Sequence, residues 1–118
     1  MASGQTLAAT ANPQNVTVAK GSVNSPFNLS GSGTNWTLVT GPAHGTVLIY
    51  STLPTPGYTN WAVIGTAAYA SPARIQYTPL LSYTGSDSFA WYASDTNGTS
   101  ATVVCSINIT SRGTSRYG

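Results

Sequence analysis

The strongest constraint on the fold is a pair of long alternating segments in the second half of the sequence. In residues 87–93 the apolar residues Phe89, Trp91 and Ala93 fall on every second position, on the same side of the chain. Alternation with a period of two is typical of a β-strand that buries one face. Residues 95–98 are Asp-Thr-Asn-Gly, a combination that favours a tight turn, so we expect the chain to reverse there.

The segment that follows, residues 101–110, predicts the return strand of this hairpin. Its apolar positions alternate with positions that mostly carry hydroxyl or amide groups, and the apolar set is Ala101, Val103, Cys105, Ile107 and Ile109. Two amphipathic antiparallel strands need a second layer to cover their apolar faces. That layer must come from the residues that precede the hairpin.

The rest of the sequence predicts more strands and no helix. Short strand patterns recur at 14–19, 26–29, 35–40, 46–50 and 74–77, with turn residues between them. Twelve glycines and seven prolines would interrupt any long helix. The chain has 118 residues and is 41% hydrophobic, which is enough for one packed core. We therefore predict a single all-β domain, a β-sandwich.

The domain boundaries follow from changes in this pattern. Residues 1–13 are small and polar without periodicity, which predicts an N-terminal arm, and residues 14–110 form the sandwich. Within it, the proline-rich residues 51–72 break the strand spacing and predict an inserted hairpin or projecting loop. Residues 111–118 form a C-terminal tail. Because the start of the sequence lacks the features of a secretory signal, we expect either no export by that route or a signal already removed.

Charged residues are unusually rare. They make up 5% of the chain, against roughly 25% in an average soluble protein. The net charge of +2 is too small to predict nucleic-acid binding, and no apolar run reaches the roughly 18 residues of a membrane span. A surface of hydroxyls and amides presents little repulsion between copies. We therefore expect a homo-oligomer, or close packing against a partner protein.

The sequence offers little for catalysis or metal binding. It has one His, one Cys, two Asp and no Glu. A Ser-His-Asp triad would need His44, which lies in a Gly-Pro turn, and no Gly-x-Ser-x-Gly elbow is present. No Cys/His cluster has zinc-ligand spacing, and Cys105 lies on the apolar side of its strand, as a buried thiol would. We predict no enzyme, no metal and no cofactor.

Three motifs carry a resemblance to a known family. They are Gly-Pro-Ala-His-Gly-Thr-Val at 41–47, Ile-Gln-Tyr-Thr-Pro at 75–79, and Tyr-Thr-Gly-Ser-Asp-Ser-Phe at 83–89 with Tyr-Ala-Ser-Asp following. Together they resemble bacterial and phage immunoglobulin-like domains of the cadherin-like tandem-repeat type. The resemblance implies an immunoglobulin-like Greek-key sandwich of about seven strands, and a role in adhesion or display. Calcium-binding members have acidic clusters where residues 31–34 here are Gly-Ser-Gly-Thr, so we expect no calcium.

Five residues of the last motif have expected fold-making roles. Gly85 permits the bend before the strand, and Asp87 can accept backbone N–H bonds in the turn. Phe89 and Trp91 are expected to fill the core. Tyr83 is expected to place its ring at one end of the sandwich with its hydroxyl bonded to the backbone, as in a tyrosine corner.

Other side chains are candidates for partner or glycan contact. Aromatic residues, Tyr50 among them, gather in and around the insertion, and two of the four cations lie in the tail. The candidates are Tyr58, Trp61, Tyr69, Arg112, Arg116 and Tyr117. Exposed aromatics favour interfaces and an arginine can dock on an acidic neighbour. The alternatives are that the aromatics close the sandwich as an extra small core, and that the tail is a frayed terminus.

These features together predict a structural protein. The favoured hypothesis is a bacteriophage virion protein, decorating the capsid or tail, that packs on a capsid or tail protein and displays an adhesive surface, with host-surface glycans as candidate ligands. Its expected location is the virion. The alternative is an adhesin or carbohydrate-binding module, or a filament subunit, on a bacterial cell surface.

Overall fold

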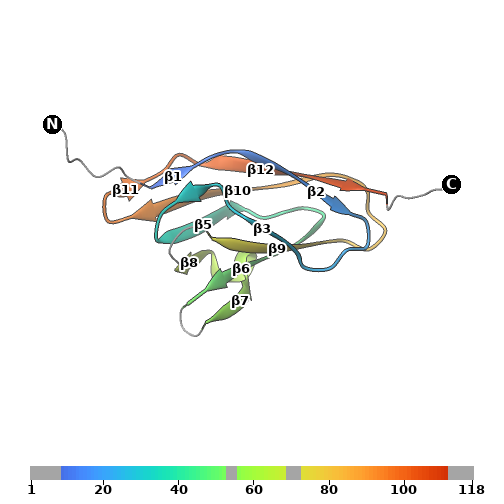
Figure 1. Cartoon of the computed structure of the whole chain (residues 1–118), viewed down its shortest axis with the longest axis horizontal. Coiled ribbons are helices and arrows are strands. Elements are labelled where there is room, and N and C mark those ends of the chain that lie inside the picture. The colour runs from blue at the N-terminus through green and yellow to red at the C-terminus, as the bar shows by residue number, and fades with distance from the viewer. Residues whose placement is uncertain (1–8, 53–55, 69–72, 112–118) are drawn as a thin grey trace.

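The computed structural model describes residues 9–52, 56–68 and 73–111, and its fold is all-β, with 64% strand and 4% helix (Figure 1). This confirms the all-β prediction. In chain order the elements are β1 (Thr10–Ala11), β2 (Gln14–Ala19), β3 (Ser25–Asn28), β4 (Gly31–Ser32), β5 (Asn35–Thr40), β6 (Gly45–Ser51), β7 (Gly57–Asn60), α1 (Trp61–Ile64), β8 (Thr66–Ala68), β9 (Arg74–Pro79), β10 (Gly85–Asp95), β11 (Gly98–Thr99) and β12 (Val103–Thr110). Strands of two residues, such as β1, β4 and β11, add to those that the sequence predicts.

The larger sheet is built on the predicted hairpin. Its strand order is β2-β12-β10-β5-β8, with β11 paired to the end of β10. Strands β10 and β12 pair antiparallel, and the turn lies where expected because Asp95 is opposite Gly98. The first long strand, β2, joins the sheet parallel to β12. Ala101, expected in the return strand, lies before it and is exposed.

The smaller sheet has the order β3-β9-β6-β7 and contains the inserted hairpin. Tyr50 of β6 is opposite Tyr58 of β7. The hairpin of β6 and β7 projects from the body in Figure 1. The chain then passes through α1 into β8, which returns to the larger sheet beside β5. The region that breaks the strand rhythm in the sequence therefore links the two sheets.

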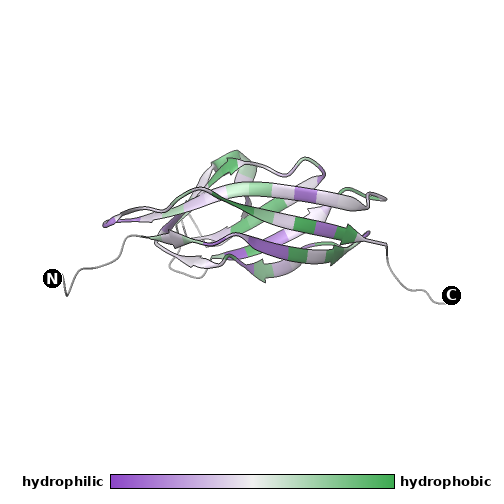
Figure 2. Cartoon of the chain, turned by 90° about the horizontal axis from the view of Figure 1, so that it is seen from above, coloured by the Kyte–Doolittle hydropathy of each residue, from purple (hydrophilic) through white to green (hydrophobic). Residues whose placement is uncertain are grey.

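The core lies between the sheets in a sandwich-like arrangement. Hydrophilic and hydrophobic residues alternate along the strands, which places one set inside (Figure 2). The tryptophan rings of Trp36 and Trp91 lie 5.6 Å apart by their centroids, and Phe89 contacts Phe27 across the sheets at 6.4 Å and Trp61 at 5.8 Å. Burying each such side chain stabilises the fold by roughly 1.5–3 kcal/mol. These five aromatic residues join both sheets and α1.

One turn of helix occurs where the sequence predicts none. The Asn60 side chain accepts a hydrogen bond from the Ala62 N–H at 2.9 Å and so caps the first turn. Gly65, with φ +76°, ends it after four residues. Only Trp61 of the helix is buried, and the helical turn directs its side chain into the core. No helix in the described residues is long and apolar enough to cross a membrane.

The described end of the N-terminal segment is part of the folded body. Thr10 and Ala11, within the predicted arm, pair with Ser32 and Gly31 of β4, where the sequence predicts a loop. Gly31 permits this approach, because a Cβ there would overlap the carbonyl oxygen of Thr10. The two backbones can therefore pair only if residue 31 has no side chain.

Two buried tryptophans provide a test of the core. The indole N–H of Trp61 donates to the carbonyl oxygen of Trp36 at 3.2 Å, whereas that of Trp91 has no hydrogen-bond partner among the described residues. Both substitutions to Phe remove similar volume, but only W61F also removes a buried hydrogen bond. We expect W61F to lower the free energy of unfolding by about 1–2 kcal/mol more than W91F, measured by urea denaturation. An equal or larger cost for W91F would contradict this account.

Candidate functional site

Of the six predicted contact residues, the structure describes Tyr58 and Trp61. Tyr69, Arg112, Arg116 and Tyr117 lie outside the described residues. Tyr58 is 38% exposed on β7.

The prediction that Trp61 belongs to an exposed aromatic contact surface is wrong. Its side chain is fully buried and packs against Phe89, so it has no ring face to offer a glycan. It takes the alternative role considered above, closing the core beneath the insertion. Of the two residues, only Tyr58 is placed where a partner could reach it.

The residues of the 83–89 motif lie at the end of the sandwich where β10 begins. The Tyr83 hydroxyl donates to the carbonyl oxygen of Ser86 at 2.8 Å, and its ring stacks on His44 with centroids 4.1 Å apart. Gly85 has φ +128°, and a Cβ there would lie 3.1 Å from the Tyr83 hydroxyl. Phe89 and Trp91 are buried in the core.

Asp87 is buried, and its carboxylate accepts four hydrogen bonds. The donors are the backbone N–H groups of Ala43, His44 and Ser88, at 2.9, 3.1 and 2.9 Å, and the Tyr77 hydroxyl at 2.5 Å. Burial and the bond to Asp87 raise the pKa of Tyr77 far above its ordinary value. Through these hydrogen bonds the carboxylate, which belongs to β10, links the turn before β6 to β9. Because it bonds the main chain of His44, it does not orient the imidazole as the Asp of a catalytic triad would.

The other reactive side chains in the described residues are also isolated. No three His, Cys, Asp or Glu residues there lie close enough together to hold a metal ion. Cys105 is fully buried opposite Phe89, and burial raises the pKa of its thiol to about 12. Since the thiolate is the nucleophilic form, this thiol is chemically inert in the folded protein.

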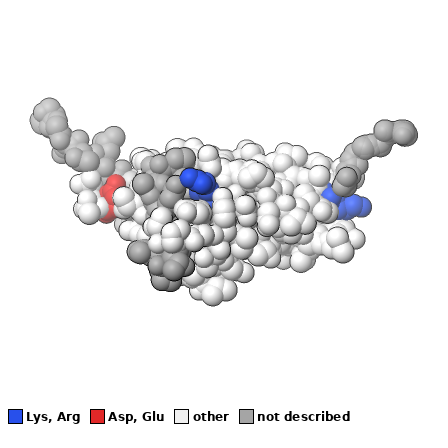
Figure 3. Space-filling view, turned by 60° about the horizontal axis from the view of Figure 1, so that its bottom comes forward, with Lys and Arg blue, Asp and Glu red and all other residues white. Residues whose placement is uncertain are grey.

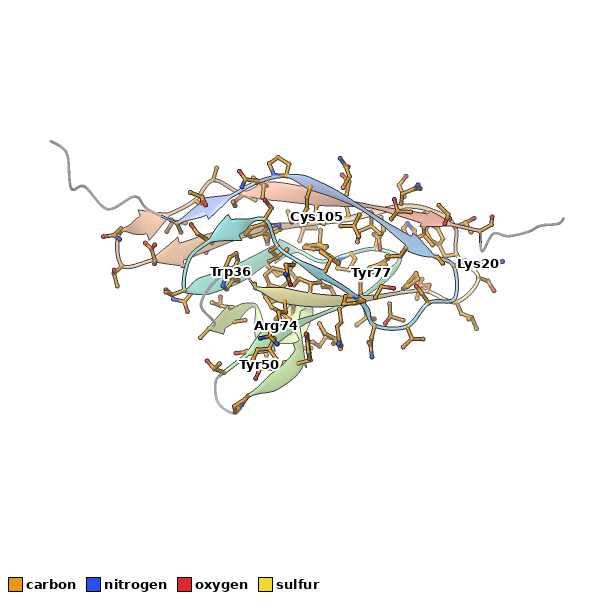
Figure 4. The ribbon with its side chains drawn as sticks, viewed as in Figure 1. Lys20, Trp36, Tyr50, Arg74, Tyr77 and Cys105 are labelled. Carbon is orange, nitrogen blue, oxygen red and sulfur yellow. The ribbon has the colours of Figure 1, made fainter. Side chains whose placement is uncertain are left out.

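One candidate surface lies on the outer face of the smaller sheet. The guanidinium carbon of Arg74 lies 5.1 Å from the ring centroid of Tyr50 (Figure 4). The ring of Tyr50 contacts that of Tyr58 edge-on, with centroids 5.4 Å apart. We call these three residues the arginine–tyrosine cluster. Sequence reasoning named the tyrosines but missed Arg74, because only the pairing of β6 with β9 brings it beside them.

The second candidate surface is a groove of about 630 Å³ on the outer face of the larger sheet. Its floor is formed by β2, β12 and β10, and the turn that contains His44 forms part of its lining. Six exposed polar side chains lie in two cross-strand rows: Asn15, Ser106 and Ser88 in one, and Thr17, Asn108 and Ser86 in the other. We call this the polar groove.

The six side chains of the polar groove make no hydrogen bond within the described part of the chain. Surface polar groups elsewhere often pair with each other, as do Thr10 with Ser32 and Thr37 with Thr66, both at 3.0 Å. The sequence signal for the groove was the hydroxyl and amide residues that alternate along 102–110. Their grouping with residues 15 and 17 depends on the parallel pairing of β2, which the sequence does not predict.

No protein-family model, curated protein or solved structure matches the chain. Relatives therefore assign no roles to its residues. The arginine–tyrosine cluster and the polar groove are interpreted below from their own chemistry.

The role of Asp87 predicts a large effect of a small substitution. In D87N one acceptor oxygen becomes an NH₂ group that faces backbone donors, so part of the buried network is lost. We expect the free energy of unfolding to fall by about 2–4 kcal/mol. The matched control is D95N, because the one hydrogen bond that the Asp95 side chain accepts among the described residues comes from the Asn97 N–H in an exposed turn, and Asn can accept it too. Comparable urea midpoints for the two variants would contradict this role.

The raised pKa of Cys105 predicts how stability depends on pH. The unfolded thiol ionises near its ordinary pKa of 9.0, whereas the folded thiol stays neutral to about 12. The unfolded state therefore loses its proton first, so stability is full below pH 9 and declines as pH rises toward 12. We expect C105A to lose less stability than the parent between about pH 8 and pH 10.5 in urea titrations. The pKa of Tyr77 is raised in both proteins, so only the difference between the parent and C105A reports on Cys105. If the free energy of unfolding fell with pH equally steeply in the two proteins, the assignment to Cys105 would be refuted.

Proposed function

We propose that this chain is a non-enzymatic structural protein of a bacteriophage virion, decorating the capsid or tail. In this proposal it has an immunoglobulin-like Greek-key fold of seven principal strands, docks on the virion lattice through the arginine–tyrosine cluster, and displays an adhesive surface. Two observations support a role without catalysis. The Asp87 carboxylate already accepts four internal hydrogen bonds, and the Cys105 thiol is buried in the core.

The strand order supports the immunoglobulin-like assignment. Such sandwiches pair the C, F and G strands in one sheet and the B, E and D strands in the other. The order β12-β10-β5 is compatible with G-F-C, and β3-β9-β6 with B-E-D. The first long strand, β2, departs from the A-B-E-D sheet of constant-type domains, because it pairs parallel with β12 instead of joining β3. The buried tryptophan of β5, Trp36, occupies a place comparable with the core tryptophan of strand C in immunoglobulin domains. In this assignment β7, α1 and β8 are an insertion between D and E.

The main observation in support of packing on a virion lattice is the scarcity of exposed charged side chains. Of the four charged residues in the described ranges, Asp87 is buried, and Lys20, Arg74 and Asp95 lie on separate parts of the surface. The face in Figure 3 is almost entirely uncharged. Copies of such a body repel one another little, so they can be held at high density on a particle.

The arginine–tyrosine cluster supports a defined docking face. Tyrosine and arginine are over-represented among the residues that dominate binding energy at protein interfaces. Stacking on Tyr50 limits the conformations of Arg74, so less conformational entropy is lost when a partner binds. The cluster lies on the opposite sheet from the polar groove, which leaves the groove facing outward when the cluster is docked.

The proposal is tested on intact particles. From a host that produces phage encoding this chain, particles are banded on a density gradient and the chain is quantified in the band. We expect it to co-band at a fixed copy number, and Y58A and R74A to lower that number several-fold, because each removes part of the docking face. Absence of the chain from intact particles would overturn the proposal.

The control for this experiment is Y92A. Tyr92 is a half-buried tyrosine on the outer face of the larger sheet, so its substitution removes similar surface from the other side of the molecule. We expect Y92A particles to keep the parental copy number. Equal losses for Y58A and Y92A would show that the cluster is not the docking face.

A cell-surface adhesin or filament subunit is the second candidate, and one observation favours it. The first and last described residues lie at opposite ends of the long axis (Figure 1). This placement lets modules follow one another in a linear array without bending the chain back. Flanking repeats of the same type in the encoding gene would favour this candidate over the virion protein.

A further inference from the structure

We infer that the polar groove binds a neutral oligosaccharide through its two rows of hydroxyl and amide side chains. This inference deepens the adhesive part of the proposed function, on which it rests, by naming the site and the chemical class of its ligand. In this inference the glycan contacts the outer face of the larger sheet and not Trp61, which is buried.

The first argument is the unused hydrogen-bonding capacity of the groove. Three serines, two asparagines and a threonine offer donors and acceptors that no protein group engages within the described residues. Neighbouring members of a row lie on adjacent strands, about 4.8 Å apart. A pyranose ring carries several hydroxyl groups around its edge, each both donor and acceptor. One ring can therefore bond to two strands, and a second ring can reach the other row.

The second argument is electrostatic. Asp87 is the only Asp, Glu, Lys or Arg among the lining residues, and its oxygens are occupied by four internal hydrogen bonds. No Lys or Arg among the described lining residues would balance a sulfate, phosphate or uronate, and no accessible carboxylate there would balance an ammonium group. The groove therefore favours an uncharged ligand.

The third argument separates a glycan from a protein partner. The described residues that line the groove include no Trp, Tyr, Phe, Met or Arg, the residue types enriched at protein interfaces. Its volume of about 630 Å³ falls in the range of small-ligand sites, about 300–1,000 Å³. A large partner would find no aromatic anchor here and only one exposed aliphatic side chain, Val104, among the described lining residues, whereas a chain of a few sugar rings fits the space and the two polar rows.

The open shape of the groove predicts weak binding by one copy. Without an aromatic platform, affinity depends on hydrogen bonds that compete with water, each of small net value. We expect Kd values of about 0.1–10 mM for a single groove. Many copies on one particle would raise the avidity by about 10²–10⁴, provided that the grooves face the same glycan-coated surface. Display at high copy number is therefore what makes such a site useful.

The test is an NMR titration of the full ¹⁵N-labelled chain. The probes are neutral gluco-, manno-, galacto- and N-acetylglucosamine oligosaccharides, with a uronic-acid oligosaccharide as the charged comparison. We expect saturable shift changes at amides in 15–17, 86–88 and 104–108 with at least one neutral probe. The variant N108A should weaken that binding at least fivefold, and S106V likewise.

The matched control is N28A, because Asn28 is an exposed strand residue of the smaller sheet. It should bind as the parent does, and unchanged spectra outside the groove show that each variant is folded. No saturable change with any neutral probe, binding by the uronate alone, or shifts centred on the arginine–tyrosine cluster would each overturn the inference. So would parental affinity in both N108A and S106V.

The outcome is separable from that of the particle experiment. A chain that co-bands with particles but binds no neutral probe leaves the virion proposal standing and removes the glycan site. A chain that binds through the groove but is absent from particles supports the site and favours the cell-surface candidate.

Discussion

The buried carboxylate of Asp87 holds the parts of this molecule in register. It accepts hydrogen bonds from the turn before β6, from β10 in the larger sheet and from Tyr77 of β9 in the smaller one. A buried charge is tolerated only when its hydrogen-bonding capacity is satisfied, and here it is. The same turn contributes to the lining of the polar groove, so the shape of that surface depends on an interaction in the interior.

The near absence of charge has different consequences on the two faces. The smaller sheet carries Arg74, held against Tyr50, and its face therefore has a cation and aromatic rings in one place. The polar groove on the larger sheet carries neutral side chains that have no hydrogen-bond partner among the described residues. Packing against protein and contact with a hydroxylated ligand need different chemistry, and the two faces proposed for these roles lie on opposite sheets.

The sequence predicts the fold class because its strongest signals are local. The alternation in 87–93 and 101–110, with a turn between them, requires only neighbouring residues to be read together. The surfaces depend instead on which distant strands pair: β2 with β12, and β6 with β9. The role of Trp61 could not be predicted because an aromatic residue after a proline-rich segment can point either way, and the choice is made by the cap at Asn60 and the core around Phe89. Gly31 likewise looks like a loop glycine until Thr10 is placed against it.

The chain has a single cysteine, and in the folded state it is enclosed by the core. Its stability therefore owes nothing to an intrachain disulfide, and the buried thiol of Cys105 is not accessible to glutathione or to dissolved oxidants while the protein stays folded. The cysteine of the folded protein therefore stays in the same state in reducing cytoplasm and in oxidising surroundings. A component made in one environment and used in the other would need no disulfide-forming step between them.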